Sequence, residues 1–152
     1  MNAMQPDRFM TEAFKQAKIA FKNNEVPVGA VITYQDQIIA KRCNEIIARK
    51  DPTAHAEILA LREACQELGT ERLVECSLYV TLEPCPMCAQ ALAFARIKSL
   101  YFGAYDPKGG GIEHGARIFE QPTCHHHPHI YGGLQEEANA ELLRVFFAER
   151  RK

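Results

Sequence analysis

The sequence predicts an α/β fold in which one β-sheet is covered by helices on both faces. Three observations lead to this prediction. The chain opens with apolar residues at helical spacing, continues with two strand-like segments joined by a polar turn, and then alternates helical and strand-like segments. Strands that alternate with amphipathic helices need a helical layer on each side of the sheet to bury both of its faces.

The N-terminal region is predicted to form a helix over 7–22, because apolar residues recur there every three or four positions. They are Met10, Ala13, Phe14, Ala17, Ala20 and Phe21. The polar pair at 23–24 ends this helix. Strands over 26–34 and 37–41 follow, and the short polar turn between them predicts an antiparallel hairpin.

The next helix is expected to begin near Asp51, which can serve as an N-cap and is followed by a proline suited to a first helical turn. Its predicted buried face consists of Ile58, Leu61, Cys65 and Leu68. The short apolar run at 78–82 is typical of a buried strand. A helix over 85–96 follows, with Pro86 at its start, where a missing N–H costs little.

The last third of the chain begins with a strand over 100–105 and a loop over 106–111. The triple glycine in this loop lacks the Gly-Lys-Ser/Thr ending of a phosphate-binding loop, so we predict a flexible turn. No clear period appears between 121 and 133. A final helix begins at Gln135, with a main apolar stripe of Leu134, Ala138, Leu142, Val145 and Phe146. Leu143 and Phe147 form a second stripe, which favours a homodimer.

Length and composition limit the alternatives. A chain of 152 residues with 47% apolar residues supports one domain over 1–152. It has no apolar run long enough for a membrane span, and charged residues interrupt its N-terminal segment, so neither membrane insertion nor export is expected. Two of the six cysteines have a metal-type spacing, which favours a reducing cytoplasm over a disulfide framework. The net charge of −1 argues against binding of nucleic acid by bulk electrostatics.

Two separated segments are expected to form one site. His55 and Glu57 lie near the predicted start of one helix, and Cys85 and Cys88 lie at the start of another. One imidazole and two thiolates make three zinc ligands, and a three-ligand site leaves a position for water, as in catalytic zinc centres. Glu57 is then placed to move the proton of that water. The pattern His-x-Glu with Pro-Cys-x-x-Cys is typical of zinc-dependent nucleobase deaminases.

Other interpretations of these residues stay open. The three donors could belong to a structural zinc knuckle with a fourth ligand elsewhere, or to a buried histidine and two unrelated thiols. We expect the remaining cysteines to pack as small apolar side chains; they are Cys43, Cys65, Cys76 and Cys124. The histidine-rich segment at 124–129 is interpreted as a turn, because no spaced partner ligand accompanies it.

Several longer motifs resemble those of bacterial tRNA-specific adenosine deaminases, a family within the cytidine-deaminase-like superfamily. His-Ala-Glu with Pro-Cys-x-x-Cys is specific for the superfamily. Asp-Pro-Thr-Ala-His-Ala-Glu-Ile together with Leu-Glu-Pro-Cys-x-Met-Cys narrows the resemblance to this family. The matching segments span nearly the whole chain and comprise 25–31, Asn44, 51–58, 82–89, 102–104 and 106–108.

The resemblance implies a three-layer α/β/α domain with a mixed, cytidine-deaminase-like sheet, a homodimer, and conversion of adenosine to inosine at the wobble position of an arginine tRNA anticodon. It implies one Zn²⁺ per chain on His55, Cys85 and Cys88, with Glu57 as the proton shuttle. The implied substrate-binding residues are Asn44, Val28, Ala56, Pro84, Asp106 and Lys108.

The basic residues of the last helix are candidates for contacts with the tRNA anticodon arm, foremost Arg150 and Arg151, with Arg144 and Lys152 beside them. Two other functions compete with RNA editing. One is deamination of a free base or nucleoside of the guanine or cytosine type by the same chemistry. The other is a non-enzymatic, zinc-stabilised interaction module, which would need neither an open metal position nor Glu57.

Overall fold

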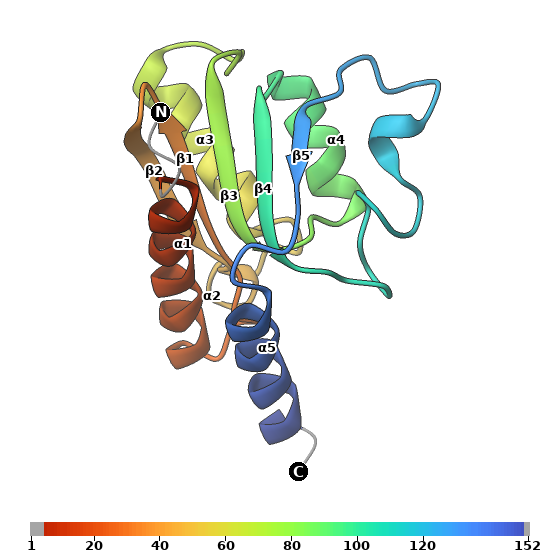
Figure 1. The fold of residues 1–152 in the computed structure, drawn as a ribbon. Helices are drawn as coiled ribbons and strands as arrows, with labels where there is room; N and C mark the ends of the chain where they lie inside the picture. The colour runs from red at the N-terminus through yellow and green to blue at the C-terminus, as the bar shows by residue number, and fades with distance from the viewer. Residues whose placement is uncertain (1–4, 151–152) are drawn as a thin grey trace.

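The computed structural model describes residues 5–150, and five strands in it form one sheet in the order β2-β1-β3-β4-β5 (Figure 1). The strands are β1 (Gly29–Tyr34), β2 (Gln37–Cys43), β3 (Cys76–Leu82), β4 (Ser99–Ala104) and β5 (His129–Tyr131). β1 pairs antiparallel with both β2 and β3, whereas β3, β4 and β5 run parallel to one another. The sheet is therefore mixed, as expected.

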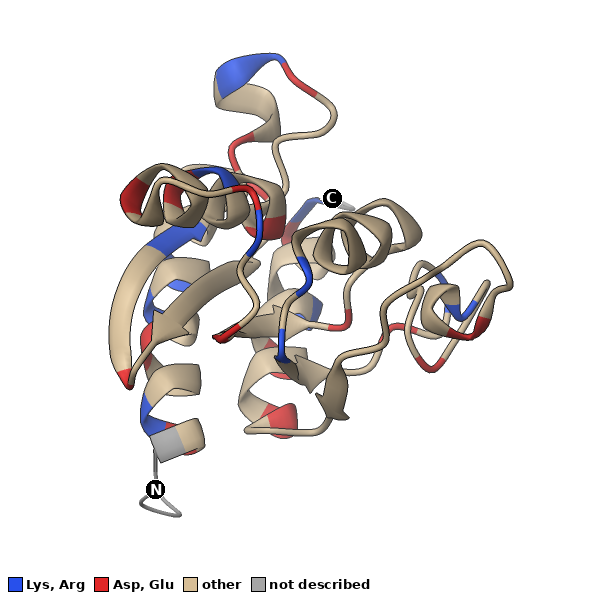
Figure 2. Ribbon diagram, turned by 90° about the horizontal axis from the view of Figure 1, so that it is seen from above, with Lys and Arg blue, Asp and Glu red and all other residues tan. Residues whose placement is uncertain are grey.

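Helices cover both faces of this sheet, which confirms the three-layer α/β/α architecture (Figure 1). α1 (Gln5–Lys22) and α5 (Glu136–Arg150) lie on one face, and α3 (Ala56–Leu68) and α4 (Pro86–Ala95) lie on the other. Between residues 5 and 150, no helix is both long and apolar enough to cross a membrane. Basic and acidic segments are interspersed along the ribbon (Figure 2).

The alternation of side chains explains why the inner strands are apolar almost throughout. Ile32, Leu78 and Leu100 belong to the core on the α3 and α4 side of the sheet. Val31 and Tyr79 belong to the smaller core beneath α1. A strand buried on both faces cannot show the apolar–polar alternation of a half-exposed strand, and these strands do not.

Three tyrosines form a stacked row across the parallel part of the sheet. The ring centroids of Tyr79 and Tyr101 are 4.5 Å apart with an interplanar angle of 3°. Those of Tyr101 and Tyr131 are 4.8 Å apart with an angle of 18°. The row links β3, β4 and the short edge strand β5, and Phe9 of α1 packs on its inner end.

Two predicted boundaries are wrong for local reasons. β1 begins at Gly29 rather than at residue 26, because the Val28 N–H donates to the Val26 carbonyl in a tight turn around Pro27. α3 begins at Ala56, with His55 as its N-cap. Asp51 is not that cap, since its carboxylate accepts hydrogen bonds from the backbone N–H and the hydroxyl of Thr53 in a turn before the helix.

The buried faces of two helices also differ from the prediction. In α3 the fully buried residues are Ala56, Glu57, Leu59, Ala60, Leu61 and Ala64, and Ile58, Cys65 and Leu68 are only partly buried. In α5 the buried residues are Asn139, Leu143 and Phe146, while Ala138 is exposed. Leu143 therefore belongs to the protomer core and does not form a second, free stripe with Phe147, which is 45% exposed.

Three short elements were not predicted from the sequence: α2 (Ile46–Arg49), the 3₁₀ helix η1 (Ile118–Glu120) and β5. Each is three or four residues long, too short to show a period. α2 depends on a distant side chain, because the buried carboxylate of Glu25 accepts hydrogen bonds from the N–H groups of Ile47 and Ala48. β5 depends on pairing with β4.

Candidate active site

The first turns of α3 and α4 meet at one point, which brings the two predicted segments together. His55 is the N-cap of α3, Cys85 is the N-cap of α4, and Cys88 lies in the first turn of α4. The Nδ1 atom of His55 lies 3.7 Å from the Cys85 sulfur and 3.5 Å from the Cys88 sulfur. These three donor atoms all lie within 4.8 Å of one another.

This spacing fits zinc. With Zn–S bonds of about 2.3 Å and Zn–N bonds of about 2.0–2.1 Å, a tetrahedral ion holds its sulfur and nitrogen ligands roughly 3.6 Å apart. The distances from His55 to the two cysteines are close to that value. Within residues 5–150, this is the one cluster of three or more His, Cys, Asp or Glu donors close enough to share a metal.

The electrostatics of the cluster suit metal binding and proton transfer. A hydrogen bond from the Cys88 thiol, assisted by His55, lowers the pKa of Cys85 to about 4, so a thiolate is present at neutral pH. The shared proton correspondingly raises the pKa of Cys88. Glu57 is only 4% exposed, and burial raises the pKa of its carboxyl to about 7, within the range suited to a general acid–base group.

Asn44 connects the end of β2 to the start of α3. Its Oδ1 atom accepts a hydrogen bond from the Ala56 N–H at 2.8 Å, and its Nδ2 atom donates to the Val26 carbonyl at 3.1 Å. Its own N–H donates to the Val28 carbonyl. Three of the expected substrate-binding residues, Val28, Asn44 and Ala56, thus form one buried group beside His55.

Of the other three expected substrate-binding residues, Pro84 precedes Cys85, and the remaining two belong to the loop after β4. The Pro84 carbonyl accepts a hydrogen bond from the Gly111 N–H at 2.7 Å. Asp106 and Lys108 lie in the loop that follows β4. The Asp106 carboxylate turns back into this loop and accepts hydrogen bonds from the N–H groups of Lys108 and Gly109. Lys108 is exposed.

A large groove lies between this loop and α5. It has a volume of about 890 Å³, and Asp106, Lys108, Arg144 and Phe147 are among its lining residues. Arg150 does not line the groove. Its Nη2 atom donates to the Asn24 side-chain oxygen at 2.6 Å, and its guanidinium lies 3.7 Å above the Phe146 ring. Arg151 and Lys152 lie outside the described residues.

Sequence reasoning did not assign a role to two buried carboxylates, Glu25 and Glu83. Burial opposes ionisation of Glu83, but hydrogen bonds from Asp106, His114 and neighbouring backbone N–H groups outweigh it and lower its pKa. A signal was present in the sequence, since a glutamate between a buried strand and a proline lies where an apolar residue is expected. Apolar spacing alone cannot reveal its partners.

Comparison with known proteins first defines the class. The family model of the MafB19-like deaminases matches residues 4–149, which agrees with the fold and with the donor cluster next to a buried glutamate. The chain is 54% identical to a tRNA-specific adenosine deaminase of Agrobacterium fabrum over 143 residues, which cover 94% of each chain. It belongs to the tRNA-specific adenosine deaminase family, and is therefore an enzyme of the hydrolase class.

Solved structures agree with this assignment. One from a study of A-to-I editing by tRNA:A34 deaminases at the wobble position of transfer RNA superposes with a TM-score of 0.88. It is 52% identical and covers 89% of this chain and 98% of its own. A guanine deaminase from Nitrosomonas europaea has a TM-score of 0.77 and 23% identity, covering 94% of this chain and 85% of its own. That likeness shows the shared fold alone.

Proposed function

We propose that the protein hydrolyses adenosine to inosine at the wobble position of a tRNA anticodon, with an arginine tRNA as substrate. One observation carries the proposal: a buried carboxylate, Glu57, lies beside three donors spaced for zinc, in a chain of this family. On this proposal, residues 1–152 act as one deaminase domain in the cytoplasm. The free state of all six cysteines is in keeping with a reducing compartment.

The chemistry follows from the positions of these side chains. His55, Cys85 and Cys88 would hold one zinc ion, which when bound makes water acidic enough to react near neutral pH. Glu57 takes a proton from the attacking water, gives it to the purine ring nitrogen, and then assists protonation of the departing ammonia. Water and adenosine thereby become inosine and ammonia. Asn44 holds the start of α3, so His55 and Glu57 keep their positions during these proton transfers.

The groove beside α5 is the proposed path of the RNA. Lys108 and Arg144 supply positive charge for phosphates, and Phe147 offers an exposed ring for stacking with an unpaired base. Arg144 also pairs with Glu141, so a phosphate would compete with that carboxylate. Arg150 can contribute charge from the end of α5, although it also joins α5 to the turn that follows α1. An anticodon loop suits this site because its bases are already unpaired, and extrusion is least costly there.

We also infer a homodimer, with an interface different from the one expected on sequence grounds. The supporting surface is the outer side of α4, where Phe94 is 72% exposed and Met87 is exposed as well. A groove of about 480 Å³ between α3 and α4 lies beside it and is lined in part by Leu61, Ala91 and Phe94. An apolar surface of this kind on a soluble protein is typical of a protein–protein contact.

Mass analysis of nucleosides tests the proposed reaction. The purified, zinc-loaded protein is incubated with an arginine tRNA anticodon stem-loop and, at equal concentrations, with free adenosine, guanine and cytosine. Inosine formed at the wobble position faster than any product from a free compound supports the proposal. Faster turnover of a free base or nucleoside would replace it by the competing function, and no turnover of any substrate would favour a non-enzymatic module. A stem-loop with guanosine at the wobble position is the matched control.

A further inference from the structure

Glu83 is a buried carboxylate that the proposed reaction does not use. It follows the last residue of β3 and lies two positions before Cys85, and its side chain has no exposed area. Burial of a carboxylate is unfavourable unless hydrogen bonds replace those it made to water. The groups that supply those hydrogen bonds therefore indicate what Glu83 holds.

Within residues 5–150, all hydrogen bonds to this carboxylate come from the loop after β4. Oε1 accepts one from the Asp106 N–H at 3.0 Å and lies 2.8 Å from Nδ1 of His114. Oε2 accepts three, from the N–H groups of Ile112 at 3.2 Å, Glu113 at 2.9 Å and His114 at 3.1 Å. One side chain thus organises the backbone of a loop that is 23 to 31 residues away in sequence.

The glycines of this loop permit the close approach. A Cβ atom on Gly110 would lie 2.5 Å from Oε2 of Glu83, and one on Gly111 would lie 2.6 Å from the backbone nitrogen of Pro86. The Gly111 N–H also donates to the Pro84 carbonyl. The chain does turn at 107–109, as predicted, but Gly110 and Gly111 are buried in a packed contact against residues 83–86, where only glycine leaves room.

We propose that Glu83 is a positioning residue that fixes the substrate-side loop relative to the metal ligands. Through the backbone it is joined to Cys85, and through hydrogen bonds it holds Asp106 and the residues that follow. The groove wall that includes Lys108 is therefore kept at a set position relative to Cys85. This inference rests on the proposed function, because it assigns the loop to RNA binding.

Glu83→Gln tests the inference at constant side-chain size. An amide has one acceptor oxygen, which the three donors at 112–114 will retain, so its NH₂ group must face the Asp106 N–H. The same NH₂ group also faces Nδ1 of His114, which can act as an acceptor for it. Two donors oppose each other only at Asp106, so the Asp106 N–H is the contact that is lost. Loss of one charge-assisted hydrogen bond should raise KM for the anticodon stem-loop about tenfold, with kcat changed less than about threefold. Zinc content should be unchanged, and amide hydrogen exchange near Asp106 should become faster.

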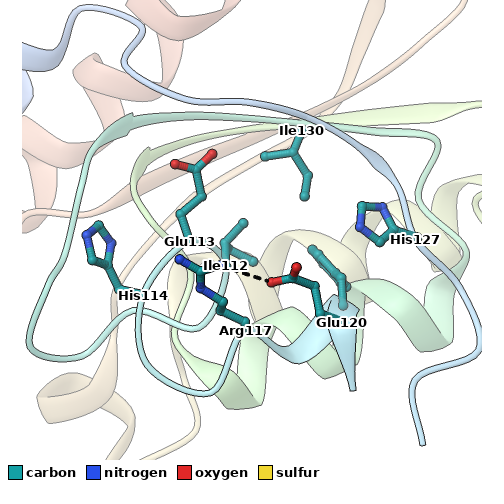
Figure 3. Close-up of a pocket in the computed structure, with 8 residues that line it drawn as sticks. Ile112, Glu113, His114, Arg117, Glu120, His127 and Ile130 are labelled. Atoms are coloured by element: carbon teal, nitrogen blue, oxygen red, sulfur yellow. Dashed lines mark ion pairs between the residues drawn. The ribbon is translucent and has the colours of Figure 1, made fainter. Parts of the chain in front are cut away.

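Two further variants make the test specific. Glu113→Gln is the matched control. Glu113 lies next to His114 on the same loop, at a pocket that Arg117 also lines (Figure 3). Its side chain accepts no hydrogen bond from any described residue. The Glu113→Gln variant should have the same KM and the same amide hydrogen exchange rates near Asp106 as the unmodified protein. Gly110→Ala disturbs the contact from the loop side without changing charge, so it should raise KM as Glu83→Gln does.

Unchanged KM and exchange in Glu83→Gln would overturn the inference. It would also be overturned if that variant lost zinc and kcat together while Gly110→Ala kept a normal KM, since Glu83 would then serve only the general fold. If the unmodified protein fails to deaminate the stem-loop, the proposed function fails, and the exchange rates alone decide whether Glu83 positions the loop.

Discussion

The Asn44 side chain and the Ala56 N–H are joined by a 2.8 Å hydrogen bond that spans twelve residues of sequence. This bond holds the first turn of α3, and with it His55 and Glu57. Asn44→Ala is expected to lower the free energy of unfolding by about 1–3 kcal/mol, because it leaves buried backbone groups without partners. Chemical denaturation measures this loss. Asn23→Ala, at an exposed position whose side chain bonds to no described residue, should have a smaller effect. An equal effect would argue against the role of Asn44.

Cys88→Ser is expected to lose zinc and stability together, because a serine hydroxyl is a poor substitute for a thiolate ligand. Metal analysis and thermal unfolding measure the two effects. Cys65→Ser changes a half-buried cysteine outside the cluster, so that variant should keep its zinc. Full zinc content in the Cys88→Ser protein would contradict the assignment of Cys88 as a zinc ligand.

Glu57→Gln should retain zinc and the fold while losing activity. Removal of a general acid–base group typically lowers the rate by about 10²–10⁴-fold, which single-turnover deamination of the stem-loop can detect. The amide is close in size to the buried carboxylate, so a folding defect is not expected. Zinc loss in this variant would instead identify Glu57 as a ligand, and retained turnover would remove it from the mechanism.

Phe94→Arg is expected to convert the proposed dimer into a monomer, because a charge at the centre of an apolar contact is costly to desolvate. Sedimentation at micromolar concentration distinguishes a species of 17.1 kDa from one of twice that mass. Ile19→Arg is the control, since Ile19 is 45% exposed on α1, on the opposite side of the sheet. A monomeric unmodified protein, or a dimer that survives Phe94→Arg, would contradict the proposed interface.

Arg150→Ala combined with Arg151→Ala should weaken stem-loop binding and flatten its dependence on salt. Each lost phosphate contact lowers the slope of log affinity against log salt by about 0.7–0.9. Arg150 also packs on Phe146, so charge and packing must be separated. Arg150→Lys keeps the charge and should keep the slope while losing the planar stacking. The same salt slope in the double variant and the unmodified protein would exclude these residues from RNA contact.

The sequence predicted those parts of the molecule whose physical cause is local. Apolar spacing was sufficient for α1, α4 and the inner strands, and the helix starts placed His55 and Cys85 correctly at N-termini. The spatial meeting of His55 with the two cysteines could be inferred because zinc requires a complete donor set. The contacts that support this site could not be inferred from the sequence. Glu25 and Glu83 act on backbone N–H groups that are 22 or more residues away, and no periodicity records such pairings.

The buried face of the final helix, α5, also depends on contacts that the sequence pattern does not reveal. The predicted main stripe includes Ala138 and leaves out Leu143, yet Ala138 is exposed and Leu143 is buried. The rotation of α5 is set by Asn139, which is buried against Gly103 of β4 and donates to the Leu134 carbonyl. A polar residue at the centre of a helix–sheet contact cannot be recognised from an apolar stripe, so the predicted stripe contained Phe146 but not Asn139 and Leu143.

The tyrosine row also gives the protein an intrinsic optical probe. The chain has no tryptophan and only five tyrosines, so near-ultraviolet circular dichroism comes largely from tyrosine, and three of these rings stack across β3, β4 and β5. The outermost ring, Tyr131, lies on a strand of three residues at the sheet edge, where local opening is least costly. If this near-ultraviolet signal is lost early during heating while the helical far-ultraviolet circular dichroism bands persist, β5 has detached before the helices unfold. No added label is needed for this measurement.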